Sequence, residues 1–207
     1  QADILYYGAS GAPARLGFGT SGDFLKTQGT GANPVWASAG GGLTQSSTWY
    51  ITTSYQPSAT SEAITNWAES NAGNYERLGT LPTQSSGVFT LPETGWWMVS
   101  VNLMCFQTSS AGDSWGLVIK TSTNSGVAYD YAGAMGNRFD SNTPDNSYRQ
   151  ITLTMILKCE DETTFRFQAW LQGVNETVFK IRGESQAADY GGTYMNIMKL
   201  ADVKGIK

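Results

Sequence analysis

The sequence predicts an all-β protein: a trimeric jelly-roll β-sandwich of about ten strands, preceded by a short neck. Three observations favour this class. Of the 207 residues only 14% are charged, 24 are glycine and 12% are aromatic. Short alternations of apolar and polar residues recur between turn residues. No long pattern has the 3.6-residue period of a helix, and the one stretch that favours a helical turn or two is 61–70.

Residues 1–42 form a segment that is too sparse to enclose a core. Its apolar residues stand in small clusters between Gly, Ala, Ser and Thr, and the run 37–48, "ASAGGGLTQSST", supplies a linker. A chain below about 40 residues needs disulfides, a metal or oligomerisation to fold. The segment contains no Cys and no His, so oligomerisation remains. We therefore expect a neck over 1–42 and a head domain over 43–207.

Apolar–polar alternation predicts the strands of the head. They cover 48–55, 87–91, 96–106, 114–121, 126–132, 148–159, 163–171 and 193–200, with 177–183 as a candidate extra strand. Antiparallel alternation then places the turns 92–95, 122–126 and 160–163 at one end of the head. The loops 107–113, 134–147 and 183–192 fall at the opposite end, which we call the tip end.

The strand over 96–106 has two apolar faces. One carries Trp97, Val99, Val101, Leu103 and Cys105, which we expect in the core. The other would expose a large apolar patch in a monomer, whereas a trimer would bury it. The residues expected at or near subunit contacts are Trp96, Met98 and Met104, with Tyr194 and Ile197 of the last strand.

Composition excludes several kinds of function. The chain has no His, which rules out Ser–His–Asp and Cys–His catalysis and removes the commonest metal ligand. A net charge of −4 without a basic stripe argues against nucleic acid as a partner. No apolar run reaches about 18 residues, so no membrane insertion is expected. Cys105 and Cys159 are expected as buried free thiols rather than as a disulfide.

The stretch 132–147 is the longest polar insertion between predicted strands, and it suits either recognition or a mobile surface loop. As tip-loop receptor-binding residues we predict Asp113, Arg138, Phe139, Asp140, Asn142 and Asp145. Arg pairs with acidic sugars or phosphates, Asn and Asp bond sugar hydroxyls, and Phe139 would offer a stacking face.

No metal or cofactor is expected. The three Asp residues of the tip set give only a weak calcium signal, because no Asp-x-Asp-x-Asp spacing is present. Among the tryptophans, Trp67 and Trp170 are the candidates for an exposed sugar platform, since Trp49, Trp97 and Trp115 fall on core faces. The acids 160–162 are expected in a solvated hairpin rather than as a catalytic pair.

Residues 87–101, "GVFTLPETGWWMVSV", resemble the signature of the complement first-component q-type globular head, the trimeric jelly roll shared with tumour necrosis factor. Phe89 is followed after five residues by Gly95, and then Trp97, Val99 and Val101 stand at every second position. The resemblance covers residues 48–201. It implies a ten-stranded jelly roll, obligate trimerisation and binding rather than catalysis. The turn at 160–162 departs from the Gly-Asp turn of that family.

The opening stretch resembles a repeat of tail and head fibres of bacteriophages and related viruses. The positions that fit are Asp3, Leu5, Tyr7, Ala14, Leu16, Gly19, Thr20, Gly22, Leu25, Pro34 and Trp36. The resemblance implies that this segment winds with two identical copies to form the neck beneath a trimeric head.

The two resemblances together predict a viral fibre-tip protein that is exposed on the virion surface and is not an enzyme. It would attach as a homotrimer to a host-cell receptor, a surface glycan or an envelope protein, and its other partners would be upstream fibre or virion proteins. Two alternatives remain: a decoration protein of capsid or tail that binds no receptor, and a glycan-degrading fibre tip.

Overall fold

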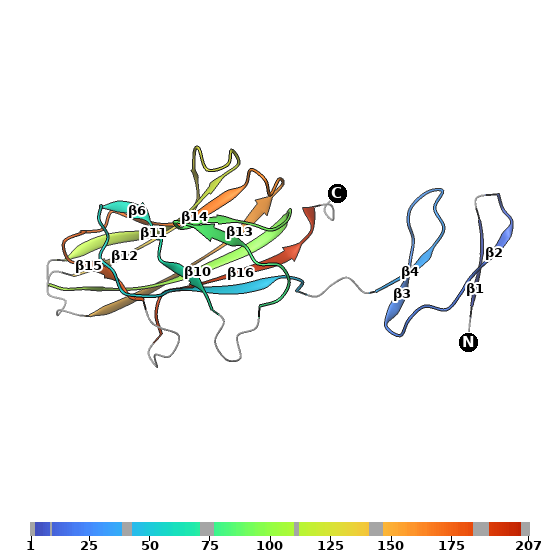
Figure 1. Cartoon of the computed structure of the whole chain (residues 1–207), viewed down its shortest axis with the longest axis horizontal. Helices are drawn as coiled ribbons and strands as arrows, with labels where there is room; N and C mark the ends of the chain where they lie inside the picture. The colour runs from blue at the N-terminus through green and yellow to red at the C-terminus, as the bar shows by residue number, and fades with distance from the viewer. Residues whose placement is uncertain are drawn as a thin grey trace. The chain divides into compact units, whose positions relative to one another are not determined.

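The computed structural model describes residues 3–8, 10–38, 43–70, 77–109, 112–140, 147–183 and 191–203 (Figure 1). Every regular element of these residues is a β-strand, and all strand pairs are antiparallel. Contacts divide the chain into two compact units, Gln1–Gly42 and Leu43–Lys207. We call the first the neck and the second the head. Within the described residues, no helix has the length and hydrophobicity needed to cross a bilayer.

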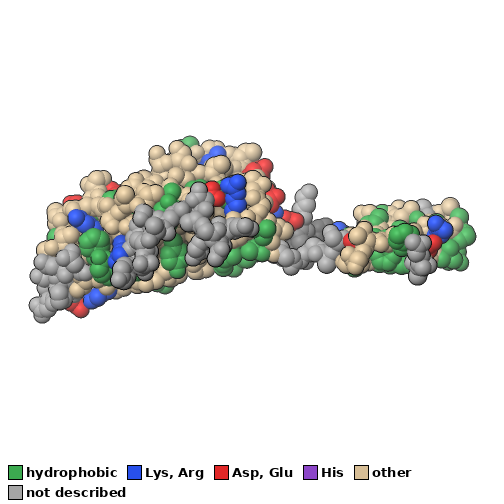
Figure 2. Space-filling view, turned by 60° about the horizontal axis from the view of Figure 1, so that its bottom comes forward, with side chains coloured by type: hydrophobic (Ala, Val, Ile, Leu, Met, Phe, Trp, Pro, Cys, Tyr) green, Lys and Arg blue, Asp and Glu red, His purple; other side chains and the backbone are tan. Residues whose placement is uncertain are grey.

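The described residues of the neck form two short hairpins without a buried core. Its strands are β1 (Ile4–Tyr7) with β2 (Pro13–Leu16), and β3 (Asp23–Lys26) with β4 (Val35–Ser38). The Trp36 indole N–H donates to the Gly17 carbonyl at 2.5 Å, and its ring covers Gly19, where a Cβ would lie 2.7 Å from Trp36 Cγ. Hydrophobic side chains stand on the surface of this unit (Figure 2). An isolated two-stranded hairpin is marginally stable in water.

The described residues of the head form two sheets of six strands each. The β10 sheet has the order β13 (Tyr148–Cys159), β10 (Gly95–Gln107), β16 (Tyr194–Ala201), β5 (Ser46–Ile51) and β7 (Trp67–Glu69), and β15 (Phe179–Ile181) also pairs with β10. The β11 sheet has the order β12 (Asp130–Phe139), β11 (Asp113–Ser122), β14 (Arg166–Gln172), β9 (Val88–Thr90) and β8 (Thr83–Ser85), and β6 (Ser61–Ala63) pairs with β14.

The core lies between the inward faces of the two sheets. Trp97, Val99 and Val101 of β10 are fully buried, as the alternation predicted. Phe89 of β9 stacks on Phe167 with ring centroids 5.0 Å apart, and the Trp49 ring meets Phe89 edge-on at 5.2 Å. Such aromatic contacts add to the stabilisation that burial itself provides. The two sheets and one shared core form the predicted all-β sandwich.

The register separates the head into two ends. Gly95 pairs with Cys159 and Ser122 pairs with Arg166, so the turns 91–94, 123–129 and 160–165 lie together at one end, which we call the base end. The chain enters the head there too, because Ser46 pairs with Met198. The strand ends that flank 108–112, 140–147 and 182–193 lie at the tip end, in agreement with the predicted partition.

Three predicted elements differ from the structure or resolve an open question. The helix expected over 61–70 is wrong: this stretch forms β6 and β7, which belong to different sheets. The polar insertion expected over 132–147 is shorter, because β12 continues to Phe139. The candidate extra strand within 177–183 is present as β15.

The two cysteines do not form a disulfide, as predicted, and both are buried. Cys159 pairs with Gly95 at the base end of the β10–β13 ladder, whereas Cys105 pairs with Arg149 near its tip end. A disulfide needs Cα atoms within about 7 Å, which this separation prevents. Burial, followed by the charges of Glu162 and Asp161, raises the pKa of the Cys159 thiol to about 11.

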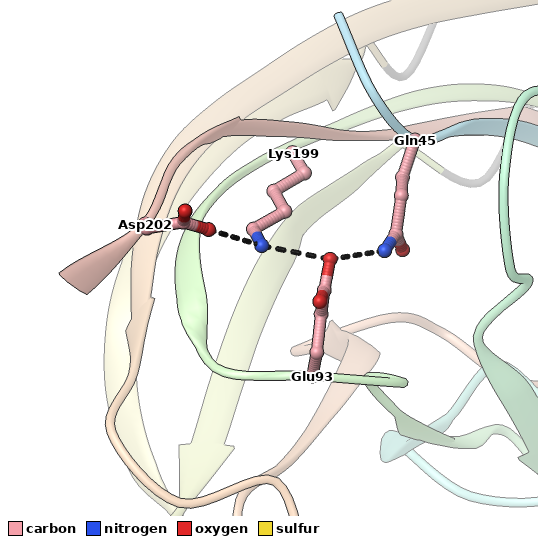
Figure 3. A network of polar contacts seen from close by, with 4 residues as sticks. All are labelled: Gln45, Glu93, Lys199 and Asp202. Carbon is pink, nitrogen blue, oxygen red and sulfur yellow. Dashed lines mark hydrogen bonds and ion pairs between the residues drawn. The ribbon is translucent and has the colours of Figure 1, made fainter. Parts of the chain in front are cut away.

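A buried lysine joins three segments at the base end (Figure 3). Lys199 of β16 is only 6% exposed, and its Nζ lies 2.7 Å from Glu93 Oε1 and 2.5 Å from Asp202 Oδ1. Gln45 Nε2 donates to the same Glu93 oxygen. Gly95 leaves the space that the lysine fills, because a Cβ there would lie 2.6 Å from Lys199 Cε.

The ion pairs of this network shift the pKa values of Lys199 and Asp202. Burial alone would lower the pKa of Lys199, but hydrogen bonds to Asp202 and Glu93 outweigh it, and the pKa is raised. The hydrogen bond from Lys199 holds the pKa of Asp202 below its ordinary value of 3.8. The stabilisation that Asp202 supplies is therefore complete above that ordinary value and is lost as the pH falls through the lower, folded-state pKa.

Removing both carboxylates should leave the Lys199 ammonium buried without compensation. We expect the double variant Glu93→Gln, Asp202→Asn to lose about 3–5 kcal/mol of unfolding free energy per chain. Adding Lys199→Met to this background should restore most of that loss, because the uncompensated charge is gone. Urea unfolding of the full chain followed by tryptophan fluorescence measures all three proteins. A double variant that unfolds at the parent midpoint would show that the network contributes nothing.

Candidate functional site

The outward face of the β10 sheet is the first candidate site. On its four longest strands, β5, β10, β13 and β16, the single outward-facing charged residue is Lys158, which pairs with Glu160. Ile156 is 58% exposed and Leu200 is 49% exposed, which is unusual for large aliphatic residues on a sheet face. The other large outward-facing apolar or aromatic residues of this surface are Tyr50, Trp96, Met98, Met104, Phe106, Tyr148, Tyr194 and Met198.

Polar residues on this face bond to one another. Ser100 and Thr154 share a hydrogen bond of 2.8 Å between their hydroxyl oxygens, and Thr48 Oγ1 donates to Asn196 Oδ1 at 2.8 Å. The register sets these four residues side by side across β13, β10, β16 and β5. Polar groups that are already paired cost little when water is removed. The face therefore suits contact with another protein surface.

Four of the five predicted subunit-contact residues lie on this face, and Ile197 does not. Trp96, Met98, Met104 and Tyr194 are outward-facing. Ile197 is fully buried in the core, where it pairs with Val99 of β10, so its assignment to a subunit contact is wrong. Met198 takes the outward position beside it, because strand alternation assigns the two neighbours to opposite faces.

The tip end holds the second candidate site. Arg138 is 69% exposed and its Nε lies 3.9 Å from Asp140 Oδ1, a surface ion pair that contributes little to stability and leaves both groups accessible. Asp113 pairs with Phe139 through the backbone, which sets it close to Arg138. The side chain of Asp113, and all of Asn142 and Asp145, lie outside the described residues. No cluster of three or more potential metal-ligating His, Cys, Asp or Glu side chains occurs within the described part of the chain.

Phe139 does not belong to the accessible tip surface, and its predicted stacking role is wrong. Its side chain is fully buried, with its ring centroid 6.1 Å from that of Trp115 and 6.4 Å from that of Phe179. The Arg149 guanidinium carbon lies 5.6 Å from the ring centroid. Because β12 extends to Phe139, strand alternation points this side chain inward, and it forms the part of the core nearest the tip end.

Of the two tryptophans predicted as exposed sugar platforms, one is buried and the other is partly accessible. Trp67 is buried, and its indole N–H donates to the Ile64 carbonyl at 2.8 Å. Trp170 is partly buried on the outward face of the β11 sheet, and Lys120 Nζ lies 3.8 Å from its ring centroid. Sequence reasoning missed this pairing. The apolar–polar alternation places both residues on outward faces. Their contact, however, depends on the pairing of β11 with β14, which are distant in sequence.

Comparison with known proteins identifies the fold of the head. No family model matches the chain, and no curated protein matches it. The structure of Eiger TNF from S. frugiperda matches with a TM-score of 0.56 and 14% identity, covering 78% of this chain and 96% of that chain. Murine APRIL at pH 5.0 matches with a TM-score of 0.54 and 10% identity, covering 75% and 98%. The head therefore has the jelly-roll fold of tumour necrosis factor-like proteins, as predicted.

Neighbouring tip residues should respond very differently to truncation. Phe139→Ala should destabilise the chain by about 3–5 kcal/mol, because it empties a fully buried aromatic position. Arg138→Ala should change stability by no more than about 0.5 kcal/mol, because the side chain is exposed. Thermal and urea unfolding of the two variants measure the contrast. Equal stability of both would show that Phe139 is not a core residue.

Proposed function

We propose that this chain is the end of a virion fibre, which assembles as a homotrimer and attaches to a receptor on the host-cell surface. The observation that carries the proposal is the pair of uncovered apolar surfaces, one in the neck and one on the head. Each is built from large side chains that a single chain leaves in water. Association of identical chains covers both at once.

The neck needs partners to become stable. Leu5 is 67% exposed, Tyr7 is 71% exposed and Phe18 is 60% exposed, and no described residue of the neck is buried. Hydrophobic surface in two isolated hairpins does not offset the entropy of ordering them. Three intertwined copies supply the missing core, which accords with the resemblance to fibre repeats.

The head supports the same assembly through the outward face of the β10 sheet. That face has exposed aliphatic residues and polar groups that are bonded within the chain. Its outward charges within the described residues are few: Lys158 on β13, which is paired with Glu160, and Lys180 on the short strand β15. Packing three copies around a three-fold axis buries this face and closes the assembly without leaving a free copy of the interface. The TNF-like fold of the head is compatible with that arrangement.

The charged residues support binding rather than catalysis. The acids 160–162 stand in an exposed turn at the base end. Hydrogen bonds from the Thr163 side chain and backbone hold the pKa of Asp161 below its ordinary value. A general acid requires the opposite shift. The tip end carries the exposed residues Arg138 and Asp140 beside long connections between strands. It lies opposite the end at which the chain enters the head, and it supplies the receptor surface.

The trimer is tested by mass and by one charged substitution. Light scattering of the full chain should give three times 22.3 kDa. Met98→Asp should break or weaken the trimer, because it buries three like charges near one axis at a cost of several kcal/mol. Val127→Asp is the matched control, since Val127 is 85% exposed in the turn between β11 and β12, which belong to the other sheet, and should leave the mass unchanged. A stable 22.3 kDa parent would overturn the assembly.

Receptor binding is tested with fluorescently labelled full chain on a panel of bacterial cells. We expect saturable binding to at least one strain, and loss of that binding in Arg138→Ala with mass and melting temperature unchanged. Absence of saturable binding on every strain, with the trimer intact, would favour a decoration role. Release of reducing sugar from the cell envelope would instead revive a glycan-degrading role.

A further inference from the structure

A second cation–aromatic group lies on the outward face of the β11 sheet, apart from the surfaces used above. Lys120 of β11 is in register with Tyr131 of β12 and Gln168 of β14. Its ammonium nitrogen lies 3.8 Å from the ring centroid of Trp170 and 5.1 Å from that of Tyr131. Tyr131 is 59% exposed. The ammonium therefore makes cation–π contacts with both rings.

The charge of Lys120 is not neutralised by any residue that the structure describes. No carboxylate within the described residues forms an ion pair with it. Lys158 makes the instructive contrast: its ammonium lies 5.7 Å from the Trp96 ring, but it pairs with Glu160. Burial lowers the pKa of Lys120, which fits a cation that lacks a counter-charge. An anion at this place would supply one.

A buried acceptor lies beside this lysine. Gln168 is only 6% exposed, and its Oε1 has no hydrogen-bond partner within the described residues. Strand alternation places it on the outward face, because Phe167 and Ala169 on either side point into the core. An unpaired amide oxygen is costly, and a hydroxyl donor from a ligand would satisfy it.

The sheet next to Trp170 is unusually bare. Gly116 of β11 and Gly136 of β12 are paired, and they follow the pair Val118–Ala134 along the ladder. A Cβ added to Gly116 would meet nothing closer than 3.5 Å, and one added to Gly136 nothing closer than 3.4 Å. The outward face therefore has a floor without large side chains, with the Trp170 indole at its edge. A flat ring can approach the backbone there.

Arg138 stands at the far end of this floor. It pairs with Ser114, so the ladder runs from Lys120 and Tyr131 through Val118 and Gly116 to the arginine. Lys120 and Ser114 are six positions apart along β11, which corresponds to about 20 Å. Two cations thus bracket a strip of the outward face that is several sugar rings long. The backbone is open over Gly116 and Gly136, whereas Val118 is covered by its neighbours. One of the two cations is the exposed tip residue of the proposed receptor surface.

We propose that this strip binds an acidic oligosaccharide. One pyranose ring packs against the exposed part of the Trp170 indole, its carboxylate pairs with Lys120, and a hydroxyl donates to Gln168 Oε1. The following rings lie over Gly116 and Gly136, and a second acidic group reaches Arg138. The inference deepens the proposed function and rests on it for its biological meaning, because it gives the receptor a chemical class.

Calorimetric titration of the full chain with hexagalacturonate tests the site. We expect binding that weakens with salt, and at least tenfold weaker binding in Lys120→Met and in Trp170→Leu. Arg138→Ala should weaken the hexamer but not digalacturonate, which is too short to reach from Lys120 to Arg138. Lys158→Met is the matched control and should bind like the parent, because that lysine is already paired. Trp170→Phe keeps an aromatic face and should retain part of the affinity if Trp170→Leu unfolds.

Several results would overturn the inference. Equal binding of neutral maltohexaose would show that charge is not recognised, and parent-like affinity of Lys120→Met would show that the strip is not the site. Polyphosphate that binds as tightly, and without need of Trp170, would identify a simple anion site. If Trp170→Leu adsorbs to cells normally while Arg138→Ala does not, the proposed function stands and the strip is excluded. If hexagalacturonate binds but no cell does, the strip stands and the proposed function fails.

Discussion

The two-residue alternation of β10 is the constraint on which the head depends. This strand pairs with β13, β16 and β15, so its orientation fixes the orientation of all three. Burial of Trp97, Val99 and Val101 against the β11 sheet commits Met98 and Ser100 to the outward face. A slip of one residue would exchange the two sets and would expose the largest side chain of the core.

Because that constraint fixes which side chains face outward, the outward faces of the two sheets differ in chemistry. On the β10 sheet, hydroxyl and amide groups are paired across neighbouring strands and large apolar residues surround them. These paired groups lose little when such a face is covered. On the β11 sheet, Gly116 and Gly136 leave the backbone uncovered, and the Arg138 side chain is exposed. The first face suits a second copy of the chain, and the second suits a small polar ligand.

Two lysines show how local surroundings decide what a charge does. Lys199 is buried with two carboxylates against it, and it ties the entry of the chain to the last strand and to the turn before β10. Lys120 lies against an indole with no carboxylate partner in the described part of the chain. The same side chain is structural in one place and open to an anion in the other, because only the neighbours differ.

The sequence by itself determined the class of fold, the face of β10 that enters the core, the division into base and tip turns, and the absence of a disulfide between the cysteines. Local alternation and composition carry that information. Tertiary pairing alone decided the rest. The strands within 61–70 are too short for a period to show, and their partners lie far along the chain. "TYMNIMKL" is apolar at both parities, so only pairing with β10 could send Ile197 inward and Met198 outward. Phe139 followed a stretch of small residues that resembles a loop, and its burial depended on the ladder between β11 and β12. Lys120 and Trp170 met for the same reason: contacts across a sheet depend on the register, which no local pattern encodes.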